Sequence, residues 1–359
     1  MTGNGLEAPH RRHEQGPRIV EKATLAAYAV AVWLVAHVPG GLSRWVIGTA
    51  AQAGYLFWPT KRAWSNANFG RVIGLPPDHP KVRRLALAAY REYARYLVEV
   101  MRLESMSAEQ GAAMVVQADV DQIEEVWRAS PGGLIFAIQH VGNTDAVAAA
   151  VGRRGWPINV LADDSTFPEM FERFRGVREK WGAHVIPWKN LREIYAVLRN
   201  REMLGLLIDW GYHADGIPVR LFGAWTTLPA GPATLAAKTN SRILPVAIRR
   251  KADGLFHVSF APIIVVPSSA PADLQRATQQ MAAALEATIA AAPEQWYSFK
   301  PMWPATDDEA AELEGRATRM LAGRPPRSSG GGGREAGPGA GDQSAVGHAA
   351  PPAAEPTSS

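Results

Sequence analysis

The chain has 359 residues, of which 47% are hydrophobic and 12 are tryptophan, and it contains no cysteine. This length allows a sizeable core in one large α/β domain with appendages, and the missing cysteines exclude disulfides, thiolate metal sites and cysteine nucleophiles. The net charge of +4 fits an anionic membrane surface or substrate, whereas no dense basic and aromatic cluster indicates nucleic-acid binding.

The N-terminal part combines a basic lead with two apolar runs. Residues 1–21 are polar and predict a disordered lead, and the uncharged run Ala23–Val38 follows. This run is short for a spanning helix, which needs about 20 apolar residues, and no small-residue cleavage site of a signal peptide closes it. The second run, Leu42–Trp58, is broken only by Arg44. The pair predicts a helical hairpin in the bilayer interface, and packing on the globular core is the alternative. The aromatic residues suited to interfacial depth are Trp33, Trp45, Tyr55 and Trp58.

Helical patterns continue to residue 130. A helix is predicted to open at Pro59, and apolar residues at helical spacing predict a long amphipathic helix over Lys81–Leu103. Weaker helical patterns cover Ser107–Gln117 and Val120–Arg128. We therefore expect residues 22–130 to form a helical, membrane-associating region.

From residue 131 strand and helix patterns alternate, which indicates a sheet with helices on both faces. The strand candidates are Leu134–Ile138, Ile158–Ala162, His184–Pro187, Met203–Ile208, Val219–Phe222, Ile243–Arg249 and Phe256–Ile264. The helix candidates are Thr144–Arg154, Phe167–Trp181, Leu191–Arg201, Ala230–Thr239 and Ala272–Ala291. The predicted fold is an α/β domain over residues 131–305 with a central, mostly parallel sheet flanked by helices (αβα). A C-terminal helix over residues 306–323 and a disordered tail over residues 324–359, poor in large apolar residues, complete the chain.

The strongest chemical signal is a His-x4-Asp pair, His140 and Asp145, at the end of a predicted strand and the start of a predicted helix. An imidazole is the usual base for activating a hydroxyl near neutral pH. Across such a corner the carboxylate can fold back and hydrogen-bond the second ring nitrogen. No G-x-S-x-G elbow supplies a serine nucleophile, so the substrate's own hydroxyl is expected to attack in a direct acyl transfer. A structural histidine beside a capping aspartate is the alternative.

Five blocks follow one another in a specific order within residues 23–305. They are HVGNTD, REKWGAHVIP, LLIDWG, LFGAWTTLPAGPATLAAKT and PEQWYSFKPMW. With the N-terminal apolar helix, this order resembles the lysophospholipid-acyltransferase-like superfamily and, within it, the bacterial lipid A lauroyl/myristoyl acyltransferase family. An Asp in place of the family's Glu, and the Lys-Pro-Met-Trp ending, look more like the phosphatidylinositol mannoside acyltransferase branch.

The resemblance implies roles for individual residues. It implies that His140 is the catalytic base and Asp145 its partner, and that Arg178 stabilises an oxyanion or holds a phosphate. Asp209 matches a site carboxylate that is usually Glu. The residues implied to shape the substrate groove are Gly223, Gly231 and Pro232. The alternatives are a solvated helix charge for Arg178, a strand-end cap for Asp209 and turn glycines.

The remaining histidines carry no pattern of a site. His184, His213 and His257 have no partner at ligand spacing and are expected to be structural or exposed. No metal site is expected, because no His/Asp/Glu cluster shows ligand spacing.

The sequence and the resemblance together predict a membrane-associated O-acyltransferase. It would move a fatty acyl group from acyl-CoA, as a co-substrate, or from acyl carrier protein to a hydroxyl of a membrane glycolipid, with a mannose of phosphatidylinositol mannoside as the implied acceptor. No cofactor is expected. The expected location is the cytoplasmic face of the inner or plasma membrane, as a peripheral or monotopic protein. The alternatives are a lipid A precursor or lysophospholipid acyltransferase, and a non-catalytic lipid-binding protein.

Overall fold

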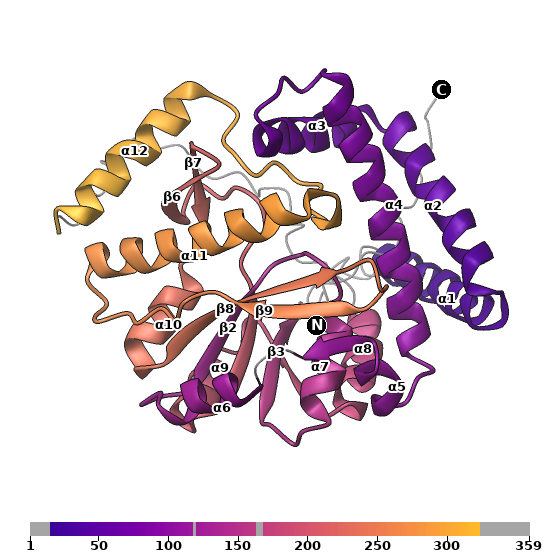
Figure 1. Cartoon of the computed structure of the whole chain (residues 1–359), viewed down its shortest axis with the longest axis horizontal. Helices are drawn as coiled ribbons and strands as arrows, with labels where there is room; N and C mark the ends of the chain where they lie inside the picture. Colours follow the sequence, from indigo (N-terminus) through magenta and orange to yellow (C-terminus); the bar gives the residue numbers. More distant parts are fainter. Residues whose placement is uncertain (1–14, 118–119, 163–167, 324–359) are drawn as a thin grey trace, which may run out of the picture.

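A seven-stranded sheet organises the chain, with strand order β1-β9-β8-β2-β5-β3-β4 (Figure 1). The computed structural model describes residues 15–117, 120–162 and 168–323. The strands are β1 (Val115–Gln117), β2 (Leu134–Ile138), β3 (Ile158–Ala162), β4 (Ala183–Pro187), β5 (Met203–Leu207), β8 (Arg242–Arg250) and β9 (Phe256–Phe260). The five strands from β8 to β4 pair in parallel, and β9 pairs with β8 in the antiparallel sense. The predicted mostly parallel α/β sheet is confirmed.

Helices cover both faces of the sheet because its strands bury side chains on both sides. On β2, Ile135 and Ala137 pack into one core cluster, whereas Leu134 and Phe136 pack into a second. The helices that contribute side chains to the first cluster include α9 (Leu191–Arg199), α10 (Gly231–Thr239) and α11 (Pro271–Ala291). The second takes side chains from α6 (Val120–Arg128) and α7 (Thr144–Gly152).

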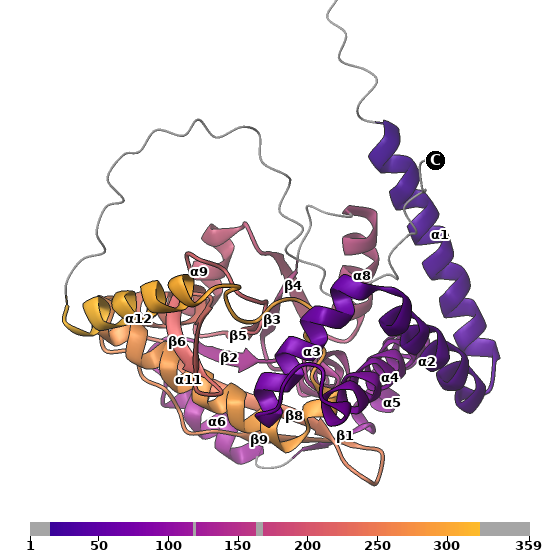
Figure 2. The ribbon, with the colours of Figure 1, turned by 90° about the horizontal axis from the view of Figure 1, so that it is seen from above.

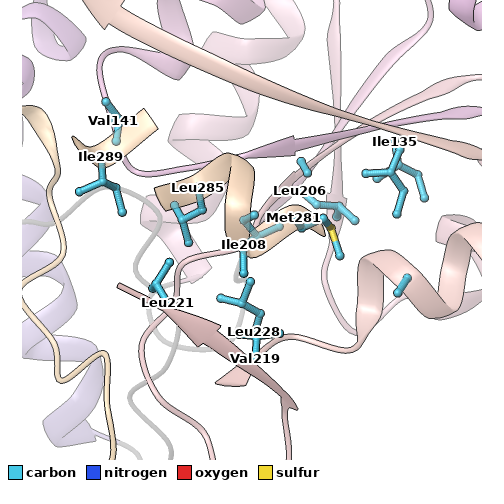
Figure 3. Packing of buried hydrophobic residues seen from close by; sticks show 14 of the residues in the cluster. Ile135, Val141, Leu206, Ile208, Val219, Leu221, Leu228, Met281, Leu285 and Ile289 are labelled. Atoms are coloured by element: carbon cyan, nitrogen blue, oxygen red, sulfur yellow. The ribbon is translucent and has the colours of Figure 1, made fainter. Parts of the chain in front are cut away.

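A separate antiparallel hairpin, β6 (Ile217–Leu221) and β7 (Ala224–Leu228), lies outside the main sheet. Its two turn residues, Phe222 and Gly223, both have positive φ, as a two-residue turn between twisted strands requires. The hairpin lies between α11 and the C-terminal helix α12 (Asp307–Leu321) in Figure 1. Apolar side chains of the hairpin, α11 and the sheet form one cluster (Figure 3).

Four long helices, followed by the short α5 (Ala108–Ala112), form the N-terminal region before β1 (Figure 1). The long helices are α1 (Gln15–His37), α2 (Gly40–Phe57), α3 (Pro59–Ile73) and α4 (Pro80–Leu103). Turned by 90°, the molecule shows α1 at its margin beside α8 (Pro168–Lys180) (Figure 2), and side chains of these two helices share a small core cluster. None of the helices in the described residues combines the length and the apolarity needed to cross a bilayer.

The structure corrects three details of the sequence prediction. Residues 15–21 belong to α1 rather than to a disordered lead, while residues 1–14 and the predicted tail lie outside the described residues. The helix expected over Ser107–Gln117 is limited to α5 (Ala108–Ala112), because Val115 and Val116 are β-branched and pair with β9 as β1. The strand expected over Val219–Phe222 pairs with β7, which the sequence did not predict, and not with the main sheet.

The α11 core provides a test of this packing. Leu285 is fully buried against the sheet and the hairpin (Figure 3), so Leu285→Ala leaves a cavity that the surrounding elements fill only in part. We expect a loss of about 2–5 kcal/mol in the free energy of unfolding, measured by denaturant titration. Leu321→Ala, at a residue 46% exposed, is the matched control and should change it by less than about 0.5 kcal/mol. Equal losses in the two variants would contradict this packing.

Candidate active site

The register of β2 and β5 brings His140 and Asp209 together. The two strands are parallel neighbours, with Ile138 opposite Leu207, and each site residue follows two positions later. His140 Nδ1 lies 2.8 Å from Asp209 Oδ1, and the His140 backbone N–H donates to both carboxylate oxygens at 3.1 and 3.0 Å. The His140 side chain is 25% exposed, whereas that of Asp209 is fully buried.

Asp209 is held as a carboxylate in spite of its burial. Trp296, itself fully buried, donates its indole N–H to Asp209 Oδ2 at 2.9 Å. Burial alone would raise the pKa of Asp209, but the charge of His140 and the hydrogen bonds from His140 and Trp296 outweigh it and lower the pKa. Asp209 therefore stays ionised.

The ionised carboxylate determines the tautomer of the imidazole. A carboxylate only accepts hydrogen bonds, so Nδ1 of His140 carries the proton that Asp209 binds. In the neutral ring Nε2 then holds the free lone pair. This is the arrangement that a general base requires, since Asp209 also stabilises the imidazolium formed after proton uptake.

Asp145 has a different partner from the one expected. Its Oδ1 accepts a hydrogen bond from Arg178 Nε at 2.9 Å, and its Oδ2 lies 3.5 Å from the Tyr96 hydroxyl. The carboxylate on the second ring nitrogen of His140 is Asp209 instead, because parallel pairing places the end of β5 directly beside the end of β2. The structure thus pairs His140 with Asp209 and Arg178 with Asp145.

Tight backbone packing fixes the loop between His140 and α7. Gly142 has φ +72°, and a Cβ at this position would meet the Ile248 carbonyl oxygen at 2.3 Å, so only glycine fits. Asn143 caps α7 by accepting a hydrogen bond from the backbone N–H of Ala146. On the other side, the Tyr297 N–H donates to the His140 carbonyl at 2.8 Å.

Arg178 lies in the last turn of α8, and α8 is held by the N-terminal region. Glu104, at the end of α4, binds Arg173 at 2.7 Å and accepts a hydrogen bond from the Tyr28 hydroxyl of α1 at 2.7 Å. The Tyr28 ring packs edge-on against Phe174. The position of Arg178 therefore depends on contacts that reach back to α1.

A cavity of about 770 Å³ is lined by both members of the Asp145–Arg178 pair. His140 and Asp209 are not among the described residues that line it, and His140 is connected with the cavity through Trp210. One side of α7 lines it, from Asp145 to Val151, a distance of about 9 Å at 1.5 Å per residue. Arg178 and Trp210 also line it, and the Trp210 ring meets the His140 ring edge-on with centroids 5.4 Å apart. Its other walls are mainly apolar and include Phe136, Ile138, Ile158, Val160, Val246, Ile248, Val258 and Phe260. The cavity thus combines the polar side chains of Asp145 and Arg178 with mainly apolar walls, and its lining residue Trp210 contacts His140.

The glycines and proline implied by the resemblance divide between two places. Gly231 and Pro232, at the start of α10, line the cavity. Gly223 lies in the β6–β7 turn, where a Cβ would have no atom within 4 Å, and it is not among the described residues that line the cavity. Its role here is to form the hairpin turn, which needs positive φ.

The other histidines differ in their surroundings. His184 and His257 lie 2.8 and 2.7 Å from the carboxylates of Glu193 and Asp253, whereas His213 is exposed and lines the cavity. Over residues 15–117, 120–162 and 168–323 no group of three or more His, Asp or Glu side chains is placed to hold a metal ion.

Sequence reasoning missed three residues that build the site, namely Tyr96, Trp210 and Trp296. Trp210 follows Asp209 directly, so an aromatic beside a strand-end carboxylate was a usable signal. Trp296 and Tyr96 come from segments far away in the chain, and no spacing pattern connects them to His140.

A model of the bacterial lipid A biosynthesis acyltransferases matches residues 13–304. The chain belongs to this family. The enzyme is therefore an acyltransferase, and the resemblance read from its ordered sequence blocks is confirmed.

Relatives of this acyltransferase are phosphatidylinositol mannoside acyltransferases. The chain is 29% identical over 302 residues to that of Mycolicibacterium smegmatis, covering 81% of this chain and 96% of the relative. It is 28% and 27% identical over 258 residues to those of two strains of Mycobacterium tuberculosis, covering 69% of this chain and 80% of each relative. These matches support the phosphatidylinositol mannoside branch over the rest of the family.

Asp209→Asn tests the buried carboxylate of this acyltransferase. Because the pKa of Asp209 is lowered in the folded state, its carboxylate stabilises the fold above the unfolded pKa of about 4, and this contribution disappears as the pH falls through the folded pKa. We expect the variant to lose about 1–3 kcal/mol in the free energy of unfolding at neutral pH. The difference from wild type should narrow below about pH 4, measured by denaturant titration in detergent. The control is Asp308→Asn, at an exposed residue. If the loss in the free energy of unfolding for Asp209→Asn is the same at every pH, the ionised Asp209 carboxylate is contradicted.

Proposed function

We propose that this acyltransferase moves a fatty acyl group from acyl-CoA or acyl carrier protein to a hydroxyl of a membrane glycolipid, a mannose of phosphatidylinositol mannoside. The observation that carries the proposal is the His140–Asp209 pair next to a long apolar cavity. The relatives are phosphatidylinositol mannoside acyltransferases, and this supports the proposed acceptor.

The geometry supports general-base catalysis by His140. Its Nε2 takes the proton of the acceptor hydroxyl as the hydroxyl oxygen attacks the thioester carbonyl carbon. The tetrahedral intermediate carries an oxyanion, and the Arg178 guanidinium in the lining of the cavity supplies positive charge for it. When the C–S bond breaks, the protonated His140 donates this proton to the leaving thiolate, and the ester product leaves. Asp209 stabilises the imidazolium through both steps.

The cavity supplies a place for the acyl chain. Its lining residues on α7 after Asp145 are apolar, namely Val147, Ala148 and Val151, and burial of hydrocarbon against them gains about 25 cal/mol per Å² removed from water. A chain held against these residues presents its thioester carbonyl where Asp145, Arg178 and Trp210 lie. No bound cofactor is needed for this chemistry, since the acyl thioester is a co-substrate.

The N-terminal helices supply a surface for membrane association. Large apolar side chains on α1, on α2 and at the junction before α3 are exposed, namely Val30, Trp33, Leu34, Leu42, Trp45, Val46, Leu56, Phe57 and Trp58. Phe57 is 85% exposed, and the exposed cations Lys22 and Arg44 lie on the same helices. Exposed apolar patches with basic residues are typical of surfaces that enter an anionic bilayer interface. We infer peripheral or monotopic binding at the cytoplasmic face of the inner or plasma membrane.

His140→Ala tests the chemistry. The variant and wild type are given radiolabelled palmitoyl-CoA and, in parallel, a phosphatidylinositol mannoside, a lipid A precursor and a lysophospholipid. We expect transfer to the mannoside, reduced roughly 10²- to 10⁴-fold in His140→Ala because the base is lost. The exposed His184→Ala is the matched control and should keep the wild-type rate.

The other outcomes of this assay discriminate between the alternatives. Transfer to the lipid A precursor alone, or to the lysophospholipid alone, would mean that this lipid and not phosphatidylinositol mannoside is the acceptor. Equal rates in His140→Ala and wild type would remove His140 from the mechanism. If wild type transfers to none of the three acceptors from acyl-CoA or from acyl carrier protein, the proposed donor and acceptor are both wrong.

The membrane surface has its own test. Trp45→Ala combined with Phe57→Ala removes two exposed aromatic side chains, each worth about 1.5–3 kcal/mol when fully buried in lipid. We expect co-sedimentation with anionic phosphatidylglycerol vesicles to weaken at least about tenfold, which corresponds to about 1.4 kcal/mol. The control is Ile263→Ala with Val265→Ala, two exposed apolar residues outside the N-terminal helices. If vesicle binding weakens similarly in both double variants, the N-terminal helices are not the membrane-binding surface.

A further inference from the structure

The loop after β5 carries two polar side chains that the acyl-transfer mechanism does not use. His213 and Asp215 are exposed, and both line the cavity. Neither side chain forms a hydrogen bond or ion pair with any of the described residues. Trp188 and Leu191, from the segment before and at the start of α9, are exposed apolar residues that also line the cavity. The exposed lining, where the cavity opens to solvent, thus includes both apolar and polar side chains.

The backbone of this loop is fixed, although its side chains are free. His213 exchanges two hydrogen bonds with Thr227 Oγ1 of β7, at 3.2 Å from its N–H and 2.6 Å to its carbonyl. The Tyr212 N–H donates to the Pro301 carbonyl at 2.8 Å. Arg316 of α12 donates to the carbonyls of Ala214 and Gly216. Three separate parts of the fold thus hold the loop, and such preorganisation is typical of a binding site because little entropy is lost when a ligand binds.

Trp210 connects this loop with the base. It follows Asp209 directly, its indole N–H donates to the Leu207 carbonyl at 2.8 Å, and its ring contacts that of His140. The half-buried ring of Trp210 therefore contacts His140 and lines the same cavity as His213 and Asp215, which follow it by three and five residues.

The chemistry of these three side chains matches a sugar. The ring of Trp210 offers an apolar face to the C–H groups of a pyranose. An imidazole both donates and accepts hydrogen bonds, and a carboxylate accepts from two hydroxyls. A phosphate fits poorly, because the Asp215 carboxylate would repel it. This argues against the phosphates of coenzyme A or a lysophospholipid headgroup at this opening.

We propose that Trp210, His213 and Asp215 bind the hexose headgroup of the acceptor and present its hydroxyl to His140. This rests on the proposed function and adds the residues that select the sugar. In this role His213 and Asp215 contact substrate hydroxyls remote from the one that reacts, so they contribute to binding equally in the ground state and the transition state.

The test compares His213→Ala, Asp215→Asn and their double variant with wild type. The substrates are phosphatidylinositol mannoside in mixed micelles and palmitoyl-CoA, each titrated at a saturating level of the other. We expect the KM for the mannoside to rise about 3- to 10-fold in each single variant and further in the double variant, since each loses one or two hydrogen bonds. The kcat and the KM for palmitoyl-CoA should stay within about twofold, as a loss of uniform acceptor binding requires.

The matched control is Asp253→Asn with His257→Ala, a pair of the same residue types that is exposed or half-exposed and does not line the cavity. An unchanged KM for the mannoside in the His213 and Asp215 variants, with transfer intact, would overturn the sugar site and leave the acyltransferase assignment standing. A fall in kcat together with a rise in both KM values would mean that the loop is structural. Absence of transfer in wild type would overturn the proposed function and this inference together.

Discussion

The parallel pairing of β2 with β5 is the constraint on which the site depends. Their register sets Ile138 opposite Leu207, the last residues of the two strands. His140 and Asp209 each follow two positions later, so they leave the sheet at the same edge. The carboxylate then accepts the ring N–H and the backbone N–H of the same histidine, so one contact fixes both the tautomer and the position of the imidazole. Trp296, which lies 87 residues after Asp209 in the sequence, completes this arrangement by its hydrogen bond to the carboxylate. A shift of one residue in the register would turn one of the two side chains to the opposite face of the sheet.

The candidate site contains two side-chain pairs, His140–Asp209 and Arg178–Asp145. In the proposed mechanism, the buried Asp209 supports the imidazole that gains a positive charge during the reaction. In the second pair, Asp145 partly neutralises Arg178, whose charge is permanent. The ion pair holds the guanidinium in place, and the Tyr96 hydroxyl lies within 3.5 Å of the same carboxylate. Each positive group in the site therefore has its own carboxylate, and this explains why a single His-x4-Asp motif contains residues from both pairs.

The sequence was informative where the pattern is local. The strands β2 and β3 begin and end where their apolar runs do, and the helix after His140 begins at Thr144 as its capping residue indicates. What spacing does not encode is which strands become neighbours. The partner of His140 lies 69 residues away, and the choice between Asp145 and Asp209 depends on strand order. The strand β1 was missed because three residues carry too short a pattern, and β7 because Trp225 and two threonines alternate only weakly.

The contacts of α1 affect how the protein can be handled. The apolar N-terminal helices are the natural target for anyone who wishes to shorten the chain to improve its behaviour in solution. Removal of α1 would strip Tyr28 from Glu104 and Phe174 and take away Glu21, whose carboxylate accepts the first free N–H of α8 from Glu169 at 2.7 Å. The helix that carries Arg178 would lose its cap and part of its apolar cover. Removal of α1 would thus disturb the helix that positions Arg178, so a shortened protein would carry an altered candidate site.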